Sequence, residues 1–232
     1  MNILVTGATR GIGKAIATSL DGNIFAAARN EDLLKIYRNY CVCDLATKEG
    51  INKLGEYIQE NKIDVLINNA GEYIYSPITN QIEFEQIERT VRLNLEVPLY
   101  LISRAVPYMQ EQGFGRIVNI GSISGVMGEA CASIYSATKA GLIGATKALA
   151  LELAEYGITV NTINPGWVDT ELGNQSVEDG DFSKDEILDC IPQKRFIAPV
   201  EIADLIKYII TKEAKGLTGQ SINLCAGLSV GY

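Results

Sequence analysis

Short runs of apolar residues alternate along the chain with longer segments in which apolar residues recur at helical spacing. Most of the apolar runs lack strict alternation, which is typical of strands covered on both faces. We predict seven strands, at Asn2–Thr6, Ile24–Ala28, Tyr40–Cys43, Ile63–Ile67, Arg116–Ile120, Ile158–Ile163 and Gln220–Leu224. Helices are predicted at Gly11–Leu20, Thr47–Glu60, about Gln81–Gln110, Ala132–Tyr156 and Val200–Thr211, with a weaker one at Asp32–Tyr37. This order indicates an α/β fold, a doubly wound parallel sheet with helices on both faces.

Two segments interrupt this rhythm. Pro98 and Pro107 fall inside the long fourth helix, so we expect a kink or an early end near one of them. Thr170–Pro192 has no sustained apolar period and is predicted to be a long loop. Loops of that length in a compact domain are often lids, so we expect a lid at about residues 170–192 of a single domain that spans residues 1–232.

Composition excludes several classes of protein. The chain has 47% hydrophobic and 21% charged residues and a net charge of −8, so it lacks the basic surface that nucleic acids or anionic membranes require. With no histidine, proton chemistry must use Tyr, Lys, Asp, Glu or Cys, and we expect no metal site. The five cysteines form no Cys-x-x-Cys pair, and no apolar run is long enough to span a bilayer. We therefore expect a soluble, cytoplasmic protein.

A glycine-rich turn follows the first predicted strand and precedes the first helix. It contains Gly7, Gly11 and Gly13. Glycines permit a tight turn and close approach of a ligand, and the helix that follows presents unpaired N–H groups to a pyrophosphate. The position of this turn in an alternating chain predicts a Rossmann-type dinucleotide site.

Charge at the end of the second strand bears on the choice of dinucleotide. NAD is usually held there by a carboxylate, whereas the 2′-phosphate of NADP needs a cation. Here the strand ends at Arg29, and Arg10 in the glycine-rich turn is a second candidate. Glu31 and Asp32 are better explained as first-turn residues of a helix capped by Asn30. We therefore expect NADP(H); the alternative is that both arginines are ordinary solvated side chains.

The candidate chemistry centres on Tyr135 and Lys139, four residues apart on a predicted helix. This spacing places them on one helix face, where the ammonium, helped by a positively charged nicotinamide, is expected to shift the pKa of the phenol towards the working pH. Ser122 ends the fifth strand, at the sheet edge where ligands bind, and its hydroxyl can bond a substrate oxygen. Tyr–Lys pairs at this spacing also occur simply because they stabilise helices, so the surrounding motifs decide whether this pair is catalytic.

Several motifs in order resemble the short-chain dehydrogenase/reductase family. They are the Gly-x-x-x-Gly-x-Gly turn, Asn68-Asn69-Ala70-Gly71, Ser122 followed after twelve residues by Tyr135-x-x-x-Lys139, and Asn164-Pro165-Gly166. The resemblance implies catalytic roles for Asn94, Ser122, Tyr135 and Lys139. It also implies cofactor contacts for Gly7, Thr9, Arg10, Gly11, Ile12, Gly13, Arg29, Asp44, Leu45, Asn68, Ala70, Gly71, Tyr135, Lys139, Pro165, Gly166, Val168 and Thr170. Ser124, Ser133 and Ser136 are competitors of Ser122 that we expect to be caps or helix-surface residues.

The pattern is most similar to the 3-oxoacyl-[acyl-carrier-protein] reductase branch. Carrier-protein reductases present arginines where this chain has Gly113 and Tyr156, and the predicted lid is acidic, with Glu171, Glu178, Asp179, Asp181, Asp185, Glu186 and Asp189 against Lys184. We therefore predict an NADPH-dependent reductase of a small ketone or 3-oxo compound. The alternatives are a carrier-protein reductase proper and a nonenzymatic NADP sensor.

We also expect a homo-oligomer, a dimer or tetramer. Small residues in the 132–156 helix would let helices approach closely, although packing on the sheet explains the same residues.

Overall fold

The computed structural model describes residues 1–179 and 183–230, except for the side chains of residues 175, 176, 178 and 179. Within this part of the chain, seven strands form one parallel sheet in the order β3-β2-β1-β4-β5-β6-β7. Their bounds are β1 Asn2–Thr6, β2 Asn23–Ala28, β3 Asn39–Val42, β4 Val65–Asn68, β5 Gly115–Ile120, β6 Ile158–Pro165 and β7 Ser221–Leu224. The predicted α/β fold is confirmed, and each predicted strand overlaps an observed one.

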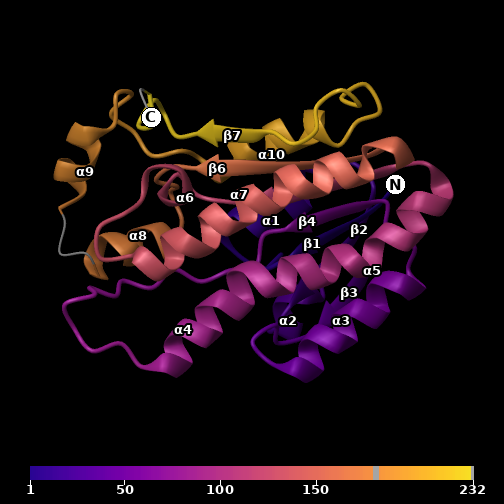
Figure 1. Cartoon of the computed structure of the whole chain (residues 1–232), viewed down its shortest axis with the longest axis horizontal. Coiled ribbons are helices and arrows are strands. Elements are labelled where there is room, and N and C mark those ends of the chain that lie inside the picture. Colours follow the sequence, from indigo (N-terminus) through magenta and orange to yellow (C-terminus); the bar gives the residue numbers. More distant parts are fainter. Residues whose placement is uncertain (180–182, 231–232) are drawn as a thin grey trace.

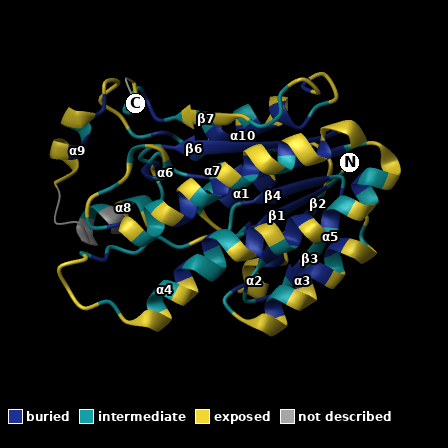
Figure 2. Ribbon diagram, viewed as in Figure 1, coloured by how far each residue is buried: buried dark blue, intermediate teal, exposed yellow. Residues whose placement is uncertain are grey.

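Helices cover both faces of the sheet (Figure 1). One face carries α1 (Gly11–Ser19) and α10 (Pro199–Ile209), and the other carries α3 (Lys48–Glu60), α5 (Val97–Gln112) and α7 (Ser133–Leu153). Successive residues of a strand point to opposite faces. Accordingly, Ile3 and Val5 pack into the core under α1 and α10, whereas Leu4 packs into the core under α3 and α5. Burial on both sides explains the unbroken apolar runs, and the exposed positions gather on the outer faces of the helices (Figure 2).

The long fourth helix is divided where the sequence predicts a break. Its parts are α4 (Phe84–Val91), a π-helical turn η1 (Arg92–Glu96) and α5. Pro98 lies in the first turn of α5, where a missing N–H costs least, and the wider turn comes just before it. Pro107 is tolerated inside α5.

The segment predicted as a long loop instead contains two helices, α8 (Glu171–Asp179) and α9 (Lys184–Cys190). The start of α9 is stabilised by a capping box, in which Ser183 and Glu186 exchange side-chain and backbone bonds. The absence of an apolar period concealed both helices, whereas Ser183-x-x-Glu186 was a readable signal. Of the predicted acidic lid, the Glu178, Asp179 and Asp181 side chains lie outside the described residues.

Three shorter elements complete the described structure. They are α2 (Glu31–Leu34), α6 (Ser124–Met127) and the 3₁₀ turn η2 (Ala154–Tyr156), which continues α7. The Asn30 side chain accepts a bond of 3.2 Å from the Leu33 N–H, so the predicted cap of α2 is confirmed. Among the described residues, no helix is both long and apolar enough to cross a membrane.

Candidate active site

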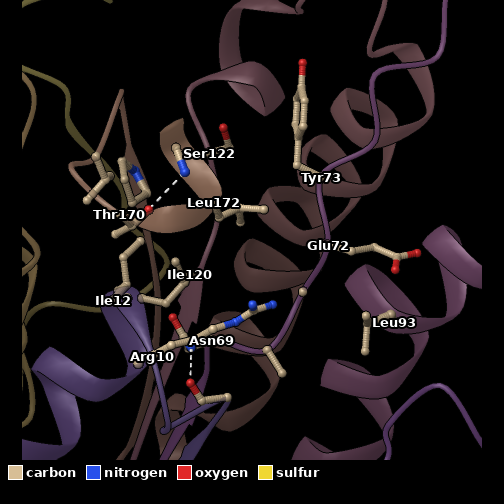
Figure 3. A pocket seen from close by; sticks show the side chains of 18 of the residues that line it. Arg10, Ile12, Asn69, Glu72, Tyr73, Leu93, Ile120, Ser122, Thr170 and Leu172 are labelled. Atoms are coloured by element: carbon tan, nitrogen blue, oxygen red, sulfur yellow. Dashed lines mark hydrogen bonds between the residues drawn. The ribbon is translucent and has the colours of Figure 1, made fainter. Parts of the chain in front are cut away.

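A cavity of about 790 Å³ opens at the carboxyl ends of the strands. Its lining comes from the segments that follow β1, β2, β3, β4, β5 and β6, with the start of α8 on one side. In Figure 3, Glu72 and Tyr73 lie on one side of this space, with Ser122 and Thr170 across from them. This edge of a doubly wound sheet is where ligands usually bind.

The glycine-rich turn forms one end of the cavity. Gly7 and Gly11 have φ values of +68° and +50°, a backbone conformation that favours glycine. A Cβ on Gly13 would lie 2.2 Å from the Gly7 carbonyl oxygen, so α1 packs against the turn with no space for a side chain. Arg10 precedes α1 and provides no side-chain cap, which leaves the first N–H groups of the helix for an anion. Thr9 and Ile12 also line the cavity.

Two arginines line the cavity, one in the glycine-rich turn and one after β2. Arg29 follows β2 directly, and both Arg29 and Arg10 are exposed on the cavity lining. Arg10 Nη1 is 4.0 Å from Glu171 Oε2, an exposed and therefore weak pair. Asp44 and the buried Leu45 line the cavity after β3, and Asp44 Oδ1 accepts a bond of 3.0 Å from the Ala46 N–H.

The Asn-Asn-Ala-Gly turn departs from the prediction at its first residue. Asn68 is the last residue of β4, and its side chain does not line the cavity but donates to Asn119 Oδ1 at 2.9 Å within the sheet. Asn69, which sequence reasoning passed over, lines the cavity instead and donates to the Thr6 carbonyl at 2.9 Å. Ala70 and Gly71 line the cavity as predicted. Asn68 is the last residue of the strand, so its side chain stays within the sheet, whereas Asn69 is the first residue beyond it.

Tyr135, Lys139 and Ser122 share the inner part of the cavity. Lys139 Nζ lies 5.6 Å from the centre of the Tyr135 ring and donates to the Ile120 carbonyl at 2.8 Å. The Ser122 hydroxyl donates to Ser124 Oγ at 2.9 Å and accepts from the Ser124 N–H at 3.1 Å. The structure therefore brings together the three groups that the sequence proposed for catalysis.

The electrostatics of this cluster differ from the expectation. Burial raises the pKa of Tyr135 to about 12; a hydrogen bond with Ser122 lowers it, and the Glu129 carboxylate raises it further. Burial also lowers the pKa of Lys139 to about 8. In the protein without cofactor, burial thus holds the pKa of the phenol above its ordinary value, and the expected shift towards neutrality with a bound nicotinamide stays a prediction.

Asn94 lies outside the cavity lining, in the π-helical turn. Its Oδ1 accepts from the Glu72 N–H at 3.0 Å, and its Nδ2 donates to the Glu72 carbonyl at 2.9 Å. A Cβ on Gly71 would lie 2.9 Å from Asn94 Oδ1 and 3.7 Å from Lys139 Nζ, so this glycine lies between the two side chains. Asn94 therefore holds the cavity wall and is placed as a positioning residue.

The segment after β6, where the family pattern implies nicotinamide contacts, also lines the cavity. Pro165, Gly166, Val168 and Thr170 all line the cavity. A Cβ on Gly166 would lie 2.9 Å from the Cys225 Cα, so only glycine fits between the two backbones. Thr170 Oγ accepts from the Gly173 N–H at 3.0 Å at the start of α8.

Sequence reasoning missed two polar residues of the inner wall, Glu129 and Tyr73. The Glu129 carboxylate accepts from the Tyr73 hydroxyl at 2.9 Å and from the Ser124 hydroxyl at 2.5 Å. Ser124 was expected to be a cap or surface residue, but it is buried and connects Ser122 to Glu129. Ser136, another of the expected surface residues, accepts from the Glu129 N–H at 3.2 Å.

Comparison with known proteins agrees with this geometry. A family model described as short chain dehydrogenase matches residues 1–181. The 3-oxoacyl-[acyl-carrier-protein] reductase FabG of Rickettsia bellii is 34% identical over 235 residues, which cover 97% of this chain and 95% of the relative.

Solved structures show the same likeness. A crystal structure of an actinorhodin polyketide ketoreductase variant with NADPH matches with a TM-score of 0.92 and 36% identity, over 99% of this chain and 97% of that one. YwfH, an NADPH-dependent reductase involved in bacilysin biosynthesis, matches with a TM-score of 0.91 and 28% identity, over 100% and 99% of the two chains. Because the region that the family model matches carries the glycine-rich turn, Ser122, Tyr135 and Lys139, the chain belongs to the short-chain dehydrogenase family of oxidoreductases.

Proposed function

We propose that the protein is an NADPH-dependent carbonyl reductase that converts a ketone or 3-oxo group into an alcohol. The observation that carries this proposal is a single cavity lined by the glycine-rich turn before α1 and by Ser122, Tyr135 and Lys139. NADPH supplies the hydride when it is bound. The cavity fits this cofactor because α1 leaves its first N–H groups uncapped and Gly13 leaves no side chain in the way.

Each inner residue has a distinct task in the proposed reaction. The Tyr135 hydroxyl gives its proton to the carbonyl oxygen as hydride reaches the carbonyl carbon. The Ser122 hydroxyl bonds the same oxygen as negative charge develops on it. The Lys139 ammonium, fixed by the Ile120 carbonyl, stabilises the phenolate left behind. Asn94 keeps the Glu72 segment in place through its two backbone bonds.

We expect kcat/KM for ketone reduction to fall as the pH rises through about 8. Lys139, whose pKa burial lowers to about 8, loses its charge there, whereas Tyr135, with a pKa of about 12, keeps its proton. A pH profile from about pH 6 to about pH 10 measures this fall. In Lys139→Arg the guanidinium stays charged, so the remaining activity should show no fall near pH 8. The same fall in that variant would contradict the assignment.

Arg29 and Arg10 support the choice of NADP(H) over NAD(H). Arg29→Asp is expected to weaken NADPH binding about tenfold to a hundredfold and to strengthen NADH binding, because a charge-assisted bond to the 2′-phosphate is replaced by repulsion. Nicotinamide fluorescence titration of both cofactors measures the change. Arg38→Asp is the matched control, since Arg38 is exposed nearby but does not line the cavity. Tighter binding of NADH than of NADPH by the wild-type protein would contradict the cofactor assignment.

A panel of ketones and 3-oxo esters tests the reaction itself. Purified protein with NADPH should reduce at least one class of carbonyl compound, followed by absorbance of the cofactor. Oxidation of NADPH that never exceeds the background of Tyr135→Phe on any member would overturn the proposal and favour a nonenzymatic NADP-binding protein.

The FabG relatives make a carrier-protein substrate the second candidate. The two positions where carrier-protein reductases present arginines, Gly113 and Tyr156, lie at the amino ends of β5 and β6, where the next residue, Gly157, approaches the Gly113 carbonyl. This end of the sheet is opposite to the cavity. Because neither of these two positions carries an arginine, we favour a free small-molecule substrate, and equal rates on carrier-bound and free 3-oxoacyl thioesters would support this choice.

We also propose a homo-oligomer, a dimer or tetramer, in the cytoplasm, with the α8–α9 segment of a single domain acting as a lid over the substrate. Exposed small residues on α7, including Ala137, Ala140 and Gly144, support helix-to-helix association. Leu151 on the same helix is 86% exposed in the isolated chain. The free state of the five cysteines supports a reducing compartment. Light scattering of the purified protein measures the oligomeric state.

A further inference from the structure

One carboxylate of the cavity wall lies beside the residues proposed for catalysis. Glu129 lies in the short connection between α6 and α7 and lines the cavity. Its two oxygens accept one hydroxyl each, from Tyr73 and from Ser124. Among the described residues, it forms no ion pair with any Lys or Arg.

The position of this carboxylate is fixed by the backbone around it. The Glu129 N–H donates to Ser136 Oγ, and the Glu129 carbonyl accepts from the Ala132 N–H at 3.2 Å. Across the cavity, the Tyr73 ring packs edge to face on Tyr135, with the ring centres 5.2 Å apart. Burial raises the pKa of Tyr73, so its hydroxyl stays protonated and keeps donating to Glu129. The negative charge is therefore held in one place.

Hydrogen bonds connect Glu129 to the reacting centre. Ser122 donates to Ser124, which donates to Glu129. The carboxylate is thus two hydrogen bonds from the hydroxyl that is proposed to hold the substrate oxygen. We therefore expect a substituent one or two carbons from the carbonyl group of a bound substrate to fall within reach of this charge.

Other charges of the cavity do not neutralise Glu129. Arg89 is paired with Glu72 at 3.0 Å, and Lys139 donates to the Ile120 carbonyl behind Tyr135. Each carboxylate oxygen has a second lone pair that remains for a donor. A hydroxyl or ammonium group of a substrate can bond there, whereas a carboxylate or phosphate meets an uncompensated like charge in a partly desolvated site.

We infer that Glu129 is a specificity-determining residue, which admits carbonyl substrates with a hydroxyl or ammonium group beside the carbonyl and excludes those with a carboxylate or phosphate there. The inference rests on the proposed carbonyl reductase function and names the substrate class of that same site. It also gives Ser124 and Tyr73 a task, since their hydroxyls hold the selecting charge.

Three ketones of similar size and different charge test the inference. They are hydroxyacetone, aminoacetone and pyruvate, assayed with NADPH at about pH 6.5, where the amine is protonated. For each ketone, the ratio of kcat/KM in Glu129→Gln to kcat/KM in the wild type cancels its intrinsic reactivity. We expect this ratio to rise about tenfold for pyruvate and to fall about tenfold for aminoacetone, relative to hydroxyacetone.

Two further variants separate charge from structure. Glu129→Asp keeps the charge and should keep the wild-type order of the three ketones. Glu152→Gln, an exposed change on α7 away from the cavity, removes the same charge and should leave all three ratios near one. Equal ratios for the three ketones in Glu129→Gln would overturn the inference. Loss of the wild-type order of the three ketones in Glu129→Asp, to the same extent as in Glu129→Gln, would also overturn it.

A binding measurement distinguishes failure of the inference from failure of the proposed function. Nicotinamide fluorescence of the NADPH complex of Tyr135→Phe gives the affinity for each ketone without turnover. We expect Glu129→Gln in this background to improve pyruvate binding and to weaken aminoacetone binding. If the wild type turns over no ketone but this order appears, the reductase proposal fails, and only the selection of ligands by the charge of Glu129 stands. If the wild type turns over a ketone, but Glu129→Gln changes the affinity for all three ketones equally, the inference fails and the reductase proposal stands.

Discussion

Tyr135→Phe is expected to lower kcat/KM for NADPH-dependent ketone reduction by about 10² to 10⁴-fold, the range typical for loss of a positioned acid. The change removes one oxygen and leaves the ring in its edge-to-face contact with Tyr73. The bond from Lys139 to the Ile120 carbonyl does not involve the phenol, so the rest of the site should persist. Steady-state kinetics measure the loss, and NADPH titration should show an affinity close to that of the wild type.

Tyr208→Phe is the matched control for this experiment. Tyr208 is 58% exposed on α10 and does not line the cavity, so its variant should reduce ketones at the wild-type rate. A Tyr135→Phe protein that retained most of its activity would show that another group supplies the proton. Since the chain has no histidine, that group would have to be Ser, Lys, Cys, a carboxylic acid or water.

Gly13→Ala is expected to damage both cofactor binding and the fold. The new Cβ would lie 2.2 Å from the Gly7 carbonyl oxygen and 2.4 Å from Asn69 Nδ2, so the turn and α1 must move apart. Overpacking of this kind costs about 1 to 3 kcal/mol of unfolding free energy. Displacement of the turn should raise the Kd for NADPH by about tenfold or more. Denaturant unfolding and fluorescence titration measure the two effects.

Gly216→Ala provides the comparison for Gly13→Ala. Gly216 is exposed, does not have a positive φ, and would meet no atom within 4 Å of a new Cβ. Replacement of glycine at such a position is expected to leave stability unchanged or raise it by up to about 1 kcal/mol, through the unfolded state. If Gly13→Ala behaved like Gly216→Ala in both measurements, the close contact between the turn and α1 would carry no functional weight.

The framework of the fold was predictable from sequence because its signals are local. Both faces of β1 and β4 are buried, so Ile3–Val5 and Val65–Ile67 form unbroken apolar runs. The glycine-rich turn and the Tyr135–Lys139 spacing are likewise short patterns on one element. The helices α8 and α9 were not found, because their described residues are mostly polar and helix formation there depends on caps rather than on an apolar face.

The inner wall of the site was harder to predict, since its contacts join residues that are far apart in the sequence. A lone Glu129 in a loop of small residues has no pattern of its own, and its partner Tyr73 lies 56 positions earlier. The Asn68 side chain is held within the sheet by Asn119, a partner 51 positions away that the turn motif does not reveal. The pKa of Tyr135 depends on burial, which spacing along a helix does not reveal.

The paired bonds between Asn94 and Glu72 have a consequence for how the cavity meets a ligand. With one amide, Asn94 satisfies both the N–H and the carbonyl of Glu72, as a neighbouring strand would. The chain beyond β4 is thereby held to the η1 turn by two hydrogen bonds to the Glu72 backbone. The wall at Glu72 is therefore ordered before a ligand binds. A ligand that contacts it loses no affinity to the ordering of a loop.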